Sequence, residues 1–65
     1  MNKLFEAQRT LQTVQTGLDE LKALLDRAEA AQGTQAEDLA VLAALKELSG
    51  VRYGIDKLAG ELLAD

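Results

Sequence analysis

One stretch near the middle of this chain, Ala31-Gln32-Gly33-Thr34-Gln35-Ala36-Glu37-Asp38, carries the signals that end one helix and begin another. Gly33 can adopt the left-handed conformation that terminates a helix, because it has no Cβ atom to clash. Thr34 is a typical N-cap residue, and Glu37 three positions later predicts a capping box. We therefore expect a helix over residues 3–31, a turn at 32–34 and a second helix over 35–63.

The segment before this turn has apolar residues at alternating steps of three and four. Its heptads place Leu4, Leu11, Leu18 and Leu25 at position a, and Ala7, Val14, Leu21 and Ala28 at position d. Four heptads without a slip predict a helix that packs along a seam. Gly17 leaves open a break, because Thr16 to Asp19 could cap a fresh helix, but the unbroken heptad phase favours a continuous one.

The segment after the turn repeats the pattern, with Val41, Ala44, Leu48, Val51, Ile55, Leu58 and Leu62 at the same steps. Two apolar seams of matching length joined by a minimal turn predict an all-α fold, an antiparallel two-helix hairpin. Leu25 is then expected near Val41, and Leu4 near Leu62. The predicted seam within the chain consists of Leu11, Leu18, Leu21, Leu25, Val41, Leu48, Val51, Ile55 and Leu58.

Two features exceed what a hairpin needs. The run from Leu39 to Leu45 is apolar on every face of its helix, and a helix of that kind is normally buried all round. Glycines inside the second helix either permit close approach by another helix or are merely tolerated at a cost in helix stability. We therefore predict a partner-binding surface formed by Leu24, Leu39, Leu42, Leu45, Gly50 and Gly54.

Length and composition limit the functions that are compatible with the chain. Its 65 residues include no Cys and no His, so disulfides are excluded and association is the expected aid to stability. The net charge of −4 argues against binding to nucleic acid or to an anionic membrane. Adjacent carboxylates diverge on a helix and form no catalytic pair. We expect a cytoplasmic protein that is not an enzyme and uses no metal or cofactor.

Part of the second half resembles a known family. The turn at Gln32-Gly33, the stretch Leu45-Lys46-Glu47-Leu48-Ser49-Gly50-Val51, Ile55, and Leu58-Ala59-Gly60-Glu61-Leu62 are similar to the needle-subunit co-chaperones of bacterial type III secretion systems. The resemblance covers about residues 20 to 63 and includes no motif in residues 1 to 19. It implies a cytosolic protein that pairs with a tetratricopeptide-like chaperone and keeps the needle subunit from polymerising early. Members often begin with a separate short helix, unlike the continuous heptads here.

The sequence thus predicts a non-catalytic interaction module that binds a protein through apolar surface near the turn. One alternative is a structural protein in which two hairpins associate as a four-helix bundle, and a homodimer is expected where no other partner is present. A second alternative is a small phage-type inhibitor of a host protein.

Overall fold

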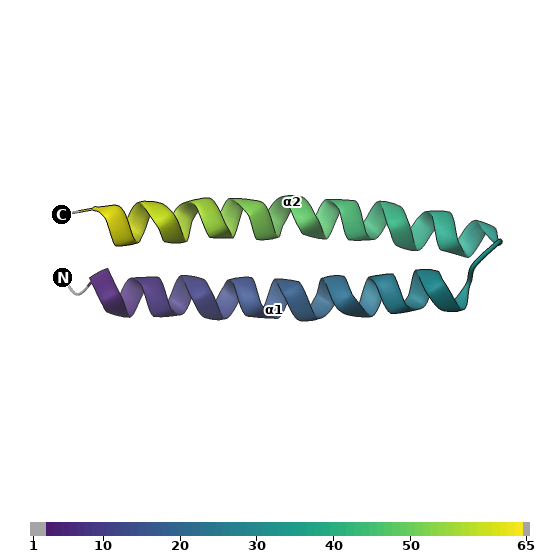
Figure 1. Cartoon of the computed structure of the whole chain (residues 1–65), viewed down its shortest axis with the longest axis horizontal. Coiled ribbons are helices and arrows are strands. Elements are labelled where there is room, and N and C mark those ends of the chain that lie inside the picture. Colours follow the sequence, from purple (N-terminus) through teal and green to yellow (C-terminus); the bar gives the residue numbers. More distant parts are fainter. Residues whose placement is uncertain (1–2, 65) are drawn as a thin grey trace.

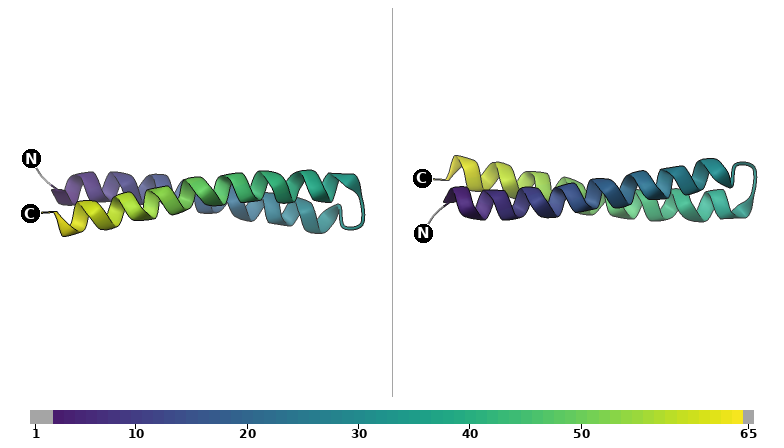
Figure 2. Two further views of the ribbon diagram at one scale, coloured as in Figure 1. Left: turned by 90° about the horizontal axis from the view of Figure 1, so that it is seen from above. Right: turned by 90° about the horizontal axis from the view of Figure 1, so that it is seen from below.

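The computed structural model describes residues 3–64, which form two helices, α1 (Lys3–Ala30) and α2 (Gln35–Leu63). The helices run antiparallel and side by side over their whole length, so the start of α1 and the end of α2 lie together (Figure 1). Seen edge-on, the two ribbons cross near their middles (Figure 2). The predicted all-α hairpin is confirmed, and each helix begins and ends within one residue of its expected bounds.

Helix α1 passes through Gly17 without a break. The expectation of a continuous first helix is therefore confirmed. Strong helix formers such as Leu, Ala, Gln and Glu dominate both helices, and no proline interrupts them.

The turn between the helices uses Gly33 as expected but is capped differently from the prediction. Gly33 has a φ of +84°, in the left-handed region, and its N–H donates to the Glu37 carboxylate at 2.9 Å. The Thr34 hydroxyl donates back to the Ala31 carbonyl, and the Glu37 N–H donates to the Thr34 carbonyl at 3.1 Å. A capping box was thus the wrong prediction for Thr34, because its hydroxyl donates to the Ala31 carbonyl, which also accepts the Thr34 N–H, and the Glu37 carboxylate accepts the Gly33 N–H instead.

The seam between the helices is rotated from the predicted one by one heptad column, that is, by one set of residues that are spaced seven apart and lie in line along the helix. Its buried members are Ala7, Thr10, Val14, Leu24 and Ala28 on α1, and Ala40, Ala44 and Val51 on α2, all at positions that fit alternating steps of three and four. Half-buried Gly17, Leu21, Gly54 and Leu58 complete the pattern. Of the predicted seam, Leu21, Val51 and Leu58 are therefore correctly placed.

The other predicted seam residues lie at the margin of the seam and remain exposed to solvent. Leu11, Leu18, Leu25, Val41, Leu48 and Ile55 each keep between 40 and 51% of their surface exposed. Their assignment to the interior of the hairpin was wrong. Smaller residues, one column away on each helix, occupy the space between the helices instead.

Two reciprocal valine–glycine pairs explain why these residues, and not the leucines, lie between the helices. A Cβ atom added at Gly54 would lie 2.8 Å from Cγ2 of Val14, and one added at Gly17 would lie 2.9 Å from Cγ2 of Val51. The valine methyl groups thus rest where a side chain would otherwise stand. Because small residues let helix backbones approach closely, this seam brings α1 and α2 nearer together than a seam of leucines would.

Candidate interaction surface

The exposed leucines beside the seam form two continuous rows, which together we call the aliphatic face. Its members repeat every seven residues and are between 40 and 60% exposed: Leu4, Leu11, Leu18 and Leu25 on α1, and Val41, Leu48, Ile55 and Leu62 on α2. Neither row contains a charged or polar residue. The aliphatic face therefore runs the length of the hairpin.

Both rows lie on the same side of the molecule. Each row follows a seam residue by four positions, as Leu11 follows Ala7 and Leu48 follows Ala44, so each is displaced in the same rotational sense about its own helix. Because the helices point in opposite directions, equal rotations bring the rows to one face of the hairpin. A groove at the open end confirms this placement, since its lining comes from both helices and consists of Leu4, Ala7, Gln8, Leu11, Leu58 and Leu62.

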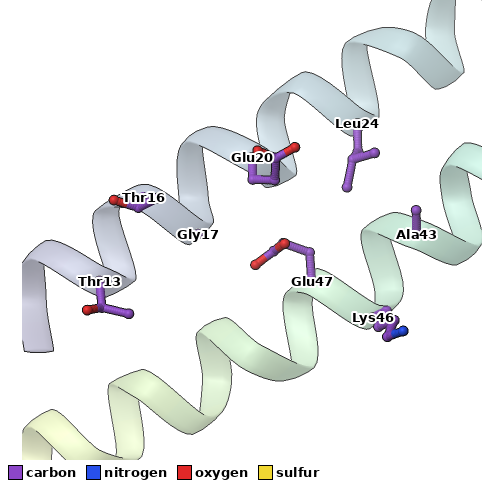
Figure 3. A pocket seen from close by; sticks show the side chains of 8 residues that line it. All are labelled: Thr13, Thr16, Gly17, Glu20, Leu24, Ala43, Lys46 and Glu47. Atoms are coloured by element: carbon purple, nitrogen blue, oxygen red, sulfur yellow. The ribbon is translucent and has the colours of Figure 1, made fainter.

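The opposite side of the hairpin is polar. An open groove there is lined by Thr13, Thr16, Gly17, Glu20, Leu24, Ala43, Lys46 and Glu47 (Figure 3). Glu47 reaches from α2 toward α1, and one of its oxygens lies 3.4 Å from the position of a Cβ atom at Gly17. The missing side chain of Gly17 thus makes room for both Val51 and Glu47.

A second polar groove lies nearer the open end, where Arg9, Tyr53 and Lys57 come from the two helices. The hairpin therefore has one aliphatic and one polar broad side.

One pair of exposed charges, Lys22 and Asp26, forms a short ion pair. Lys22 donates to the Asp26 carboxylate at 2.7 Å, and this hydrogen bond, with the attraction of the opposite charge, raises the pKa of Lys22 above its ordinary value. Both side chains are solvated, so the pair contributes little to stability. Within residues 3–64, no cluster of Asp or Glu side chains has the geometry to hold a metal ion.

The predicted partner-binding residues divide into two groups. Leu39, Leu42 and Leu45 are 62, 62 and 55% exposed, on the part of α2 nearest the turn. We call these three residues the outer leucine patch. The prediction that α1 cannot bury all three is confirmed, because α1 covers only Ala40 and Ala44 in this part of α2.

The remaining three residues have different surroundings. Leu24 is 8% exposed and lies in the seam, and Gly54 lies against Val14, so both were wrongly assigned to a partner surface. Gly50 is exposed, and no described atom lies within 4 Å of a Cβ placed there. Of these two glycines, only Gly54 lies against another helix, and that helix is α1.

Sequence reasoning missed the aliphatic face because it placed those residues inside the hairpin. A signal was present in the pairing of valine with glycine at equal distances from the turn, Val14 with Gly54 and Gly17 with Val51. Such pairs indicate which heptad column of each helix faces the other helix, because a glycine leaves space for a valine opposite it.

Comparison with known proteins gives no match, whether with family models, with curated proteins or with solved structures. Neither helix is apolar enough over a sufficient length to cross a membrane, in the part of the chain that the structure describes.

Proposed function

We propose that this chain is a non-catalytic interaction module that binds another protein through the outer leucine patch. The observation that carries the proposal is the exposure of Leu39, Leu42 and Leu45, at successive steps of three residues, on a helix whose other side is already covered. Burying leucines of this kind contributes about 1.5–3 kcal/mol each when burial is complete. A patch of three is therefore enough to anchor a protein of complementary shape.

The patch is also placed well for docking. Residues 31–34 join the helices directly, so no long loop covers this end of the hairpin (Figure 1). The two hydrogen bonds of Glu37 and Thr34 to the turn hold the start of α2 in place. A partner would thus meet a preformed surface and would lose little free energy in ordering it.

A co-chaperone role in type III secretion is a narrower form of this proposal. Its only support is the resemblance of the second half. The unbroken helix α1 departs from the separate short first helix that is common in that family. The geometry therefore favours the general form, a module that docks through the leucines near the turn.

Site-specific photocrosslinking in the source cell tests the proposal. A photoreactive phenylalanine analogue placed at Leu42 should give an adduct with a different protein, identified by mass spectrometry. The same analogue at Asp56 is the matched control, because Asp56 is exposed and lies on the same helix column fourteen residues further on. The proposal is wrong if Leu42 gives no adduct, gives only self-adducts, or gives the same adducts as Asp56.

A further inference from the structure

We propose that the aliphatic face is the contact surface for a second copy of this chain, and that two hairpins close into a four-helix bundle. This proposal concerns a surface that adjoins the outer leucine patch at Leu45, which lies four residues after Val41 and three before Leu48, and it stands independently of the function proposed above. Five observations support it: the lack of a core in one hairpin, the width of the apolar stripe, the size of the broad side that carries the face, its symmetry and its twist.

A single hairpin does not enclose a core. Among the described residues, no large side chain is fully buried, and four of the seven buried apolar residues are alanines. All the leucines and the isoleucine of the aliphatic face remain in water at the same time. A chain of 65 residues is already at the size where one core is marginal, so covering this face is what association would supply.

The heptad pattern fits a helix with two neighbours better than a helix with one. In α1 the stripe of apolar and small residues is three columns wide: the a column of leucines, the d column from Ala7 to Ala28, and the column of Thr10, Gly17 and Leu24. The hairpin seam uses the second and third columns and leaves the a column exposed. A helix in a four-helix bundle contacts neighbours on two sides, and its apolar stripe has this width.

The broad side that carries the aliphatic face is close in size to one partner's share of a stable dimer interface. The hairpin measures 49 by 14 by 11 Å between Cα positions, and the two helices lie side by side across its broad sides (Figure 1). A broad side of 49 by 14 Å presents roughly 700 Å², which is close to the ~800 Å² that each partner buries in a standard interface.

The face is also self-complementary. Relative to the antiparallel register of the valine–glycine pairs, its residues lie in four rungs that are staggered by two positions: Leu4 with Leu62, Leu11 with Ile55, Leu18 with Leu48, and Leu25 with Val41. The rungs are about 10 Å apart, at seven residues of 1.5 Å rise. A two-fold axis brings an identical set of rungs opposite, so the rungs of one copy can enter the gaps of the other.

The twist of the aliphatic face favours a second copy of the chain over an unrelated surface as its partner. The helices cross rather than run straight, so the aliphatic face twists along its length (Figure 2). A partner must have the same twist to stay in contact over 49 Å. Another copy has that twist by construction, and the face carries no charge that would repel its equivalent.

Sedimentation equilibrium of the purified full chain measures the proposed assembly. We expect a mass of twice 7.0 kDa, and a thermal midpoint by circular dichroism that rises by about 10 °C over a hundred-fold increase in protein concentration. A species of 7.0 kDa, folded or unfolded, overturns the proposal, and so does any assembly larger than two. In the first case the face would be left for a different protein.

Paired variants locate the interface. The double substitution Leu18→Glu with Leu48→Glu charges one central rung, and we expect at least a hundred-fold weaker dimerisation. Leu39→Glu with Leu42→Glu is the matched control, since it places the same two charges on more exposed leucines outside the face and should leave the mass at the dimer value. Equal effects of the two changes overturn the assignment. The two proposals can fail separately. If the chain forms the dimer but the analogue at Leu42 gives no adduct with a different protein, the function proposed for the outer leucine patch is wrong and the dimer interface stands.

Discussion

Replacing Gly54 by alanine tests whether the glycines of the seam set the spacing of the two helices. Alanine favours the helical backbone by about 1 kcal/mol relative to glycine. At Gly54, however, the new Cβ would lie 2.8 Å from Cγ2 of Val14, well inside ordinary van der Waals contact. Overpacking of this kind costs about 1–3 kcal/mol. We therefore expect the free energy of unfolding to fall by roughly zero to 2 kcal/mol.

Gly50→Ala is the matched control on the same helix. No described atom lies within 4 Å of a Cβ at that position, so the gain in helix propensity stands alone. We expect Gly50→Ala to raise the free energy of unfolding by about 0.5–1 kcal/mol. The difference between the two variants should thus be about 1–3 kcal/mol, in favour of Gly50→Ala.

The assay is urea denaturation followed by circular dichroism, with every variant at one protein concentration because association is linked to folding. The double variant Val14→Ala with Gly54→Ala returns the lost space, so it should be more stable than the sum of its single changes by about 0.5–3 kcal/mol. The argument for close approach fails if Gly54→Ala is as stabilising as Gly50→Ala, or if the double-mutant cycle shows no coupling.

Three further changes test the turn and the seam. Gly33→Ala should lower the free energy of unfolding by about 1–2 kcal/mol, because the positive φ at this residue strains any Cβ, and an unchanged urea midpoint would contradict the observed turn. Leu24→Ala should lower the free energy of unfolding by about 2–5 kcal/mol. Leu25→Ala, at the neighbouring exposed position, should instead chiefly lower the average mass measured in dilute solution. Reversed effects would mean that Leu25, and not Leu24, lies in the seam. Glu61→Leu should raise the free energy of unfolding by about 1–3 kcal/mol, since a buried oxygen of Glu61 has no hydrogen-bond partner, and a lowered urea midpoint would contradict this.

The secondary structure of this protein follows from local chemistry in its sequence. The turn was predictable because Gly33 is the residue that accepts a positive φ, and the helices were predictable because apolar residues recur at helical spacing without proline. The antiparallel arrangement followed from a connection too short to allow another. The exposure of Leu39, Leu42 and Leu45 was also predictable, since α1 can cover only one stripe of α2.

What the tertiary structure alone decided is the column of each helix that lies inside the hairpin. Periodicity identifies an apolar stripe, but rotation within the stripe depends on which side chains of two helices fit together. Here the valines enter the spaces at Gly17 and Gly54, and the larger leucine rows turn outward by one column. That rotation converts most of a predicted interior into the aliphatic face. The sequence thus determined two helices and their turn, whereas steric fit between the helices determined which surface is left for another protein.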